Sequence, residues 1–361
     1  MSNYYLGFSA FSGIGPKRFA RLVAEFGSAK NAWKVETSAL EKVIGKNLTA
    51  KFVDFQKHFS LEGYEEELYN KHIKYLTLED EKYPKILKNM GSYPPFVLYY
   101  KGDVSVFTKP RAIGIVGTRN ISEYGQQVTQ LLASQLVNAG FVIVSGLAFG
   151  VDAAAHTTTI EEKGKTIAVL GCGVDCCTPR TNQKIYDAII HSGGLIVSTQ
   201  PPGEKANKGS FPARNKIIAG LSQGIVVTEG TADSGALITA KWAHEMGRPV
   251  FAVPGPITSR LSEATSQLLK NGAVPLTCAN DILDTLGIIG VRKTGKPQRV
   301  RASDISDNPI EQSILNLLDN ESLHFNEIVR RIGKDSKNIG SILSLMELKG
   351  LVKSNGEIYS M

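Results

Sequence analysis

The sequence predicts an α/β protein whose main domain contains a mostly parallel sheet with helices on both faces. Seven short apolar segments follow one another through residues 113–277, and helical patterns separate most of them. Near-continuous apolar strands that alternate with helices are typical of parallel sheets, because both faces of such a sheet are covered. We therefore expect a Rossmann-like, doubly wound sheet with strands at residues 113–117, 141–146, 166–171, 194–199, 224–230, 249–255 and 273–277.

Helical patterns also fill residues 1–75, which we interpret as an N-terminal helical domain. Its sequence Gly13-Ile14-Gly15-Pro16 precedes a segment whose apolar residues recur at helical spacing. A Gly-x-Gly turn before a helix exposes backbone amides, which can hold a phosphate. The pattern is similar to a helix-hairpin-helix or SAM-like element, and a simple turn between two helices explains it equally well.

The remaining segments complete the domain organisation. Residues 76–286 form the α/β domain, and residues 287–308 carry a basic run that we interpret as a solvated linker. Residues 309–361 predict a winged helix, because three amphipathic helices precede two short strands around an Asn-Gly turn, which is a strong hairpin signal. Domains of this type often bind DNA. Protein contact and simple packing explain this one about as well, because its third helix carries little positive charge.

Composition limits the class of protein only loosely. The chain has 361 residues, of which 42% are hydrophobic and 21% are charged, as in an ordinary globular protein. Lys and Arg number 41 against 34 Asp and Glu, and the net charge of +7 gives weak support for a polyanionic partner. The N-terminus has no signal-peptide pattern, and no uncharged apolar run reaches the ~20 residues that cross a bilayer. The sequence therefore predicts a cytoplasmic location.

The four cysteines form neither a disulfide framework nor a metal-binding pattern. Cys172, Cys176 and Cys177 cluster, but no second Cys or His pair follows at the spacing that zinc requires. Small buried thiols are the favoured interpretation. The turn after the first strand lacks the G-x-G-x-x-G pattern of dinucleotide sites. We therefore expect neither a metal nor a cofactor.

Ligands of such sheets bind outside the carboxyl ends of the strands, where several polar and small residues are expected. Arg119 follows the first strand beside a helix N-terminus, where a guanidinium can grip a phosphate. Pairing with a surface carboxylate is the alternative. Small residues elsewhere along this edge allow a phosphate to approach the backbone. These candidates are Gly117, Thr118, Ser145, Gly146, Ser234 and Gly235.

The segment 199–215 between two predicted strands is longer than a usual strand-to-helix connection. Within it, Lys208 and Arg214 flank Phe211. Cations beside an aromatic residue are typical of a single-strand platform, because the charges follow the phosphates and the ring stacks on a base. A buried core residue is the competing interpretation of Phe211. We expect Asn215 to act as a hydrogen-bonding residue.

Three titratable residues near the same edge suggest catalysis as an alternative. Asp152 and His156 lie one helical turn apart, and Glu229 ends a later strand. An acid/base pair is one interpretation, and a structural cap with its hydrogen-bond partner is the other. Glu229 has no second carboxylate beside it at helical spacing, which weakens its interpretation as a general base.

Several long motifs closely resemble those of the DNA-processing protein A family, also called DprA or Smf. They are the runs IGIVGTR, SGLAFGVDAAAH, GSFPARNKIIAGLS and SGALITAKWAHEMGRPVFAVPG, together with a D-x-x-Y-P motif that begins at Asp80. The flanking helical segment and the winged helix also suit longer members of the family. The sequence departs from the usual family pattern at Thr178, Gln200, Lys216 and Ala264.

The resemblance implies a protein of natural transformation and DNA recombination that protects incoming single-stranded DNA and loads the RecA recombinase onto it. It also implies a homodimer, an encounter with single-strand-binding protein and no catalytic activity. The family's DNA pocket corresponds to Arg119, Lys208, Phe211 and Arg214. Two other functions remain as alternatives: a nucleotide N-glycoside hydrolase on a related fold, and a transcription regulator that acts through residues 309–361.

Overall fold

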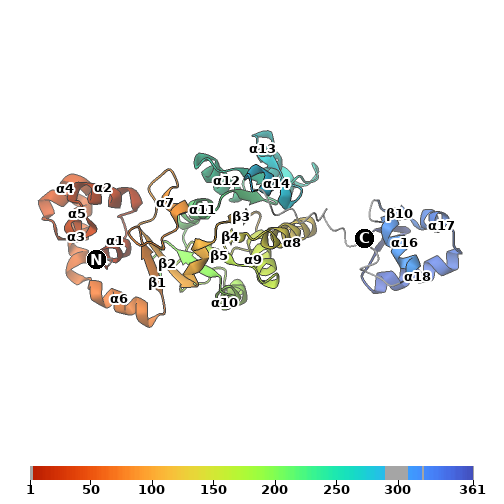
Figure 1. Ribbon diagram of the computed structural model, residues 1–361, viewed down its shortest axis with the longest axis horizontal. Coiled ribbons are helices and arrows are strands. Elements are labelled where there is room, and N and C mark those ends of the chain that lie inside the picture. Colours follow the sequence, from red (N-terminus) through yellow and green to blue (C-terminus); the bar gives the residue numbers. More distant parts are fainter. Residues whose placement is uncertain (1–2, 289–307, 319–320, 361) are drawn as a thin grey trace. The chain divides into compact units, whose positions relative to one another are not determined.

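The computed structural model describes residues 3–288, 308–318 and 321–360. Its contacts group the chain into two compact units, Met1–Val291 and Arg292–Met361, which are described separately below (Figure 1). The basic linker expected at 287–308 lies almost wholly outside the described residues. Among the described helices, none combines the length and the apolar character needed to cross a bilayer.

The first unit is built around a nine-stranded sheet in the order β1-β2-β6-β5-β4-β3-β7-β8-β9. All seven predicted strands are present, and each pairs in parallel with its neighbours among the seven. The expected fold class is therefore confirmed. These strands are β3 (Ala112–Val116), β4 (Val142–Ser145), β5 (Thr166–Leu170), β6 (Leu195–Ser198), β7 (Ile225–Val227), β8 (Val250–Ala252) and β9 (Val274–Pro275).

Two further strands were not predicted from the sequence. β1 (Lys74–Thr77) and β2 (Val97–Gly102) pair antiparallel with each other, and β2 also pairs antiparallel with β6. They extend one side of the sheet toward the N-terminal helices.

Helices cover both faces of the sheet, as expected for a doubly wound fold (Figure 1). On one face, α8 (Glu123–Asn138) and α9 (Val151–Glu161) pack on β3, β4 and β7. On the other face, α11 (Ser210–Leu221) and α12 (Ala236–Glu245) pack on the same central strands. The remaining helices of this domain are α7 (Lys85–Lys88), α10 (Gln183–His191), α13 (Glu263–Lys270), α14 (Ala279–Thr285) and the short 3₁₀ turns η1 (Val104–Thr108), η2 (Arg180–Asn182) and η3 (Arg260–Ser262).

The N-terminal region is helical, as predicted, and shares a hydrophobic core with the sheet. The Phe19 and Phe96 rings stack at 4.0 Å, and the Tyr99 hydroxyl donates to the Ser9 hydroxyl at 3.1 Å. These contacts fix the helices against β2. The six helices are α1 (Asn3–Ala10), α2 (Pro16–Phe26), α3 (Ala29–Lys34), α4 (Thr37–Ile44), α5 (Lys46–His58) and α6 (Leu61–Asn70).

The long segment after β6 is shorter than the sequence suggested. We expected a connection over residues 199–215, but α11 begins at Ser210. Pro212 lies in the first turn of this helix, where proline is tolerated because the N–H groups there have no intrahelical acceptor. Phe211 and Arg214 therefore lie on α11, and only Lys208 lies on the loop.

The second unit has the predicted winged-helix architecture. Three helices pack around one apolar cluster, and a three-stranded sheet in the order β10-β12-β11 completes it. Gly356 has φ 68° in the turn between the last two strands, as the Asn-Gly signal requires. The elements are α16 (Pro309–Leu318), β10 (Leu323–His324), α17 (Phe325–Ile332), α18 (Ser336–Leu348), β11 (Lys353–Asn355) and β12 (Ile358–Ser360).

Candidate nucleic-acid interface

The candidate site lies where the strand order of the sheet reverses. β3 has β4 on one side and β7 on the other, and the chain leaves β3 for a helix on one face of the sheet. Open parallel sheets bind ligands at the carboxyl ends of the strands beside such a point. The turn after β3, the loop after β4 and the N-terminus of α11 meet there, because their side chains line the same cavities.

The turn after β3 is held firmly by its neighbours. The Thr118 N–H donates to the Glu229 carbonyl at 2.8 Å, and the Thr118 carbonyl accepts from the Val151 N–H at 3.1 Å. A Cβ at Gly150, where φ is 69°, would clash with that same Thr118 carbonyl. At Gly117 a Cβ would come within 2.6 Å of the Val151 side chain. The backbone that carries Arg119 is therefore fixed, while its side chain is exposed.

Arg119 lies against the aromatic ring of α11. The carbon of its guanidinium is 5.1 Å from the centroid of the Phe211 ring, which is a cation–π distance. Phe211 is only partly buried, so it is not a fully enclosed core residue. Of the two interpretations considered for Arg119, pairing with a surface carboxylate does not occur among the described residues, and its guanidinium is available to a phosphate.

Lys208 is exposed on the loop just before α11. The Asn207 side chain accepts from the Gly209 and Ser210 N–H groups at 2.9 and 3.0 Å, and this cap shapes the turn that contains Lys208. Within the described part of the chain, the Lys208 ammonium has no ion-pair partner. We refer to Arg119, Lys208 and Phe211 as the rim cluster.

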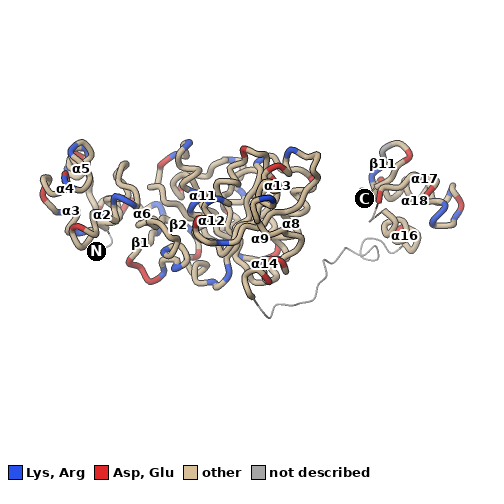
Figure 2. The backbone as a smooth tube through the Cα atoms, turned by 90° about the horizontal axis from the view of Figure 1, so that it is seen from above, with Lys and Arg blue, Asp and Glu red and all other residues tan. Residues whose placement is uncertain are grey.

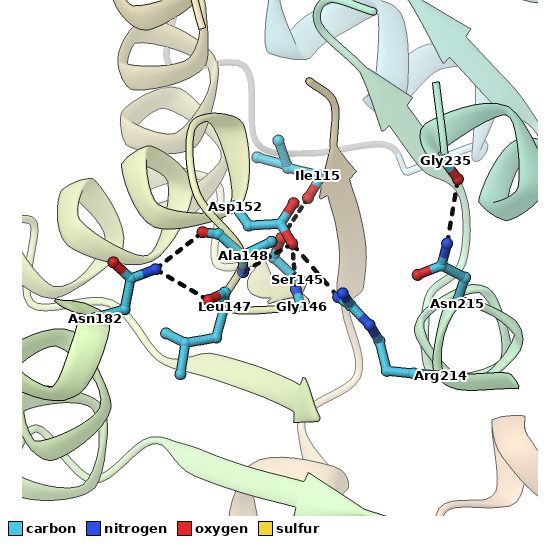
Figure 3. Close-up of polar contacts among 10 residues, drawn as sticks. All are labelled: Ile115, Ser145, Gly146, Leu147, Ala148, Asp152, Asn182, Arg214, Asn215 and Gly235. Carbon is cyan, nitrogen blue, oxygen red and sulfur yellow. Dashed lines mark hydrogen bonds and ion pairs between the residues drawn. The ribbon is translucent and has the colours of Figure 1, made fainter. Parts of the chain in front are cut away.

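Arg214 does not join the rim cluster as an exposed charge. Its side chain is 6% exposed, and its Nη1 lies 3.4 Å from the Asp152 Oδ2 (Figure 3). Burial lowers the pKa of Arg214, and the Asp152 carboxylate offsets part of that shift. The expected contribution of Arg214 to the charge presented to DNA is therefore corrected. Its guanidinium is the cation of a buried ion pair.

Gly146 and Ser145 also have different roles from those expected. The Gly146 N–H donates to Asp152 Oδ2 at 3.2 Å, so it is not free to bind a phosphate. A Cβ at this position would overlap Nη1 of Arg214, which explains the glycine. Ser145 is fully buried, and its hydroxyl donates to the Ile115 carbonyl at 2.7 Å (Figure 3). Gly146 thus helps to hold the buried Asp152–Arg214 pair, and Ser145 bonds to strand β3; neither residue offers a free group to a ligand.

The loop after β4 is part of the same arrangement. The Ala148 N–H also donates to Asp152 Oδ2 at 3.2 Å. From the other side, Asn182 Nδ2 donates to the Leu147 and Ala148 carbonyls at 3.0 and 3.1 Å. Leu147 has φ 59°, a value that non-glycine residues seldom adopt and that is common at functional sites. We refer to Asp152, Arg214 and the amides of Gly146 and Ala148 as the buried network.

A polar cavity of about 280 Å³ lies beside Arg119. Asn215 donates from Nδ2 to the Gly235 carbonyl at 3.1 Å, which joins α11 to the start of α12 (Figure 3). A Cβ placed at Gly235 would meet no atom within 4 Å, and the N-terminus of α12 adjoins the cavity. Such a helix terminus favours an anion. The structure brings together at this cavity the predicted residues Gly117, Thr118, Arg119, Arg214, Asn215, Ser234 and Gly235.

A second, smaller cavity of about 110 Å³ is also bordered by Arg119. Phe211 forms part of its wall together with Gly171, Cys172 and Pro179. Phe149 also lines it, and this residue was not among our predictions. We call this space the aromatic cavity. The cysteine cluster contributes only the buried Cys172, whose thiol donates to the Cys176 carbonyl.

The three candidate acid/base residues are each engaged in structural contacts. Asp152 belongs to the buried network. His156 is fully buried, its Nδ1 lies 2.7 Å from the Thr166 hydroxyl, and burial lowers its pKa to about 3. The Glu229 carboxylate accepts from the hydroxyl and the N–H of Ser122 at 2.5 and 3.1 Å. The expected cap with its hydrogen-bond partner is not what the structure shows: Asp152 holds the loop before α9 without capping the helix, and His156 bonds to Thr166.

Basic and acidic residues both occur throughout the part of the chain that the structure describes. Figure 2 shows basic and acidic positions interspersed along the described chain. Polyanion binding by such a surface depends on a few cations in suitable positions, because opposite charges nearby cancel the long-range field. Arg119 supplies one such cation beside the Phe211 ring, and Lys208 supplies an exposed cation three residues before Phe211 in the chain.

Comparisons with known proteins agree with the fold and identify the family. Residues 74–287 match the family described as DNA recombination-mediator protein A, and residues 298–356 match the DprA winged helix domain. Protein Smf of Synechocystis is 38% identical over 315 residues, which cover 86% of this chain and 79% of that protein. DNA processing protein DprA of Bacillus subtilis is 42% identical over 211 residues, or 58% of this chain and 70% of that protein.

Two solved structures of similar sequence extend the comparison. DprA from Streptococcus pneumoniae is 32% identical with a TM-score of 0.70, and the match covers 79% of this chain and 98% of that one. DprA from Helicobacter pylori, described for its unique mode of binding single-stranded DNA, is 32% identical with a TM-score of 0.53. That match covers 60% of this chain and 96% of the other.

Proposed function

The chain belongs to the DNA recombination-mediator protein A family, and we propose on that premise that its α/β domain binds single-stranded DNA without reading the sequence. The observation that carries the proposal is the rim cluster: two exposed cations without carboxylate partners, one of them stacked on a partly exposed phenyl ring. The H. pylori relative binds single-stranded DNA. Family members are recombination mediators and not known enzymes, so we propose a binding function without catalysis.

The chemistry of the rim cluster suits an unpaired nucleic-acid strand. Arg119 and Lys208 contact phosphates, while Phe211 offers a ring face to a base. Stacking tolerates any base, because every base has a π-face, and contributes roughly 1–3 kcal/mol per base. The polar cavity and the N-terminus of α12 provide a further position for a phosphate.

The first test is an equilibrium titration with oligo-dT. Arg119→Ala and Lys208→Ala should each weaken binding and flatten its dependence on salt, because one phosphate contact on a single strand changes the slope of log K against log salt by about 0.7. Lys109→Ala is the matched control, since this exposed lysine precedes β3 at the opposite edge of the sheet. Unchanged affinity in both rim variants would contradict the proposal.

A second test compares single and double strands of the same sequence. Paired bases are stacked inside the helix and cannot reach an exposed ring. Duplex DNA should therefore bind more weakly than either separate strand at equal salt. Equal affinities would be compatible with phosphate binding by Arg119 and Lys208 but would rule out the stacking role of Phe211.

We further propose that the protein acts in the cytoplasm as a homodimer that loads RecA onto DNA coated by single-strand-binding protein. Deletion of residues 309–361 tests whether single-strand binding resides in the first unit. The truncated protein should retain single-strand binding if the rim cluster is the site, and lose DNA binding if the winged helix is the reader. RecA assembly on coated oligonucleotides, measured with and without Lys208→Ala, tests the loading step.

A further inference from the structure

The aromatic cavity has two phenylalanine walls that come from different elements. Phe211 lies in the first turn of α11, and Phe149 lies in the loop between β4 and α9. Arg119 borders the same cavity. Its volume of about 110 Å³ is of the same order as a cavity of roughly 150 Å³ that holds one benzene molecule. The space therefore has room for no more than one aromatic ring.

Phe149 is 47% exposed at the mouth of this cavity. Exposure alone assigns no role, because single exposed apolar residues are normal on protein surfaces. The position is more informative than the exposure. The ring lines the same cavity as Phe211 and Arg119, and Arg119 is one of the two cations that are proposed to hold the phosphates.

The loop that carries Phe149 is constrained on every side. Asp152 accepts hydrogen bonds from the Gly146 and Ala148 amides, and Asn182 donates to the carbonyls of Leu147 and Ala148. Immediately after Phe149, Gly150 has φ 69° and packs its Cα against the turn after β3. A side chain on such a fixed loop loses little backbone entropy on binding a ligand. The loop thus presents Phe149 in a defined place.

We propose that Phe149 is a second base-contacting residue, so that an unpaired base entering the aromatic cavity lies against both Phe149 and Phe211. This inference rests on the proposed single-strand function and adds a specific contact to it. The base contacts the two rings inside the cavity, and Arg119 at its border holds the adjoining phosphate. The ligand class is an unpaired nucleotide within a strand, since the base needs the cavity and the phosphate needs the rim cations.

The experiment measures binding of the full-length protein to oligo-dT and to the same oligonucleotide with abasic sites. Phe149→Ala should weaken binding to oligo-dT by roughly 5- to 150-fold, the range for loss of one base stack. Its salt slope should equal that of the parent, because no phosphate contact is removed. On the abasic oligonucleotide, parent and variant should bind alike. Tyr69→Ala, which removes an 80% exposed ring on α6, is the matched control.

A variant that keeps an aromatic face separates base contact from support of the loop. Phe149→Trp should retain at least the parental affinity for oligo-dT. If Phe149→Ala weakens binding to abasic and normal oligonucleotides equally, the residue supports the loop and the inference is wrong. If it binds oligo-dT like the parent while Phe211→Ala does not, the second contact is wrong and the proposed function stands. If both variants bind like the parent, neither ring contacts a base, and the stacking part of the proposed function fails together with this inference.

Discussion

Two arginines lie at the same edge of the sheet and border the same polar cavity, yet they occupy opposite environments. Arg119 is exposed and lies on the Phe211 ring, whereas Arg214 is buried and paired with Asp152. The first is free to move toward a phosphate. The second is fixed by a carboxylate and by a glycine that leaves room for it. Residue type and strand position are thus insufficient to assign a ligand-binding role to an arginine.

The difference between the two sites lies in what surrounds each charge. A buried guanidinium needs a partner, because the transfer of an unpaired ion out of water costs several kcal/mol. Asp152 meets that need and at the same time holds the loop that ends in Phe149. The cations of the rim cluster are exposed to solvent instead, and they have no carboxylate partner among the described residues. They can therefore bind a phosphate without first breaking an ion pair. We expect the buried network to govern stability and the rim cluster to govern binding.

The largest expected effect comes from breaking the buried network. Asp152→Ala leaves the Arg214 charge buried without a partner and removes the acceptor for the Gly146 and Ala148 amides. The free energy of unfolding should fall by about 3–5 kcal/mol, measured by urea denaturation. Asp233→Ala is the control, because it removes an exposed carboxylate at the same cavity and should not change the urea midpoint. Equal midpoints for both variants would show that the ion pair is dispensable.

The next effect is a pH dependence that arises from His156 below the network. Burial, followed by the nearby Arg214 charge, lowers the pKa of His156 to about 3 in the folded state, against 6.5 in the unfolded chain. The unfolded state therefore binds the proton first, and stability falls as the pH decreases through 6.5 toward 3. Between pH 7 and pH 5 the loss should be about 2 kcal/mol.

The variant His156→Gln isolates this contribution. Its stability should change less than that of the parent between pH 7 and pH 5, because glutamine does not titrate. Urea midpoints at several pH values in that range give the comparison. Parallel curves for the two proteins would mean that His156 takes up its proton without unfolding, which would contradict its enclosed position.

A comparable effect, on binding instead of stability, should follow from removal of the ring in the rim cluster. Phe211→Ala should weaken binding to oligo-dT by about 1–3 kcal/mol, because the stacking face is lost. Its urea midpoint should fall far less than that of Asp152→Ala. Fluorescence titration and urea denaturation on the same preparation measure both quantities. If Phe211→Ala is strongly destabilising and its folded fraction binds oligo-dT normally, then Phe211 governs stability and not binding, contrary to our expectation for the rim cluster.

The sequence was sufficient to predict the parallel strands but not the edge of the sheet next to the helices. The seven parallel strands are apolar runs of the kind that only a doubly covered sheet contains. β2 (Val97–Gly102) was missed because it follows two prolines and pairs antiparallel with β1, so no strand–helix alternation marks it. The connection after β6 was predicted too long, since the sequence does not show that a helix already begins at Ser210.

The candidate site was predicted in outline, and its division into two environments was not. Arg214 and Asp152 are 62 residues apart, and Glu229 binds a serine 107 residues away, so no local pattern reveals either contact. Phe149 follows an apolar strand and looks like part of the core in sequence. Only the hydrogen bonds that turn its loop outward place it at the cavity. Long-range pairing therefore decides which polar residues remain available to a ligand.

The smallest expected effect is the coupling between Arg119 and Phe211 within the rim cluster. A double-mutant cycle on the free energy of unfolding, with Arg119→Ala, Phe211→Ala and the double variant, should give about 0.5–1 kcal/mol, as for an exposed cation–π contact. If the guanidinium leaves the ring to bind a phosphate, the same cycle on oligo-dT affinity should give a coupling of similar size and opposite sign, because the contact is lost in the complex. A binding coupling of zero would mean that Arg119 stays on the ring, so the base must then contact Phe211 from the side of the aromatic cavity.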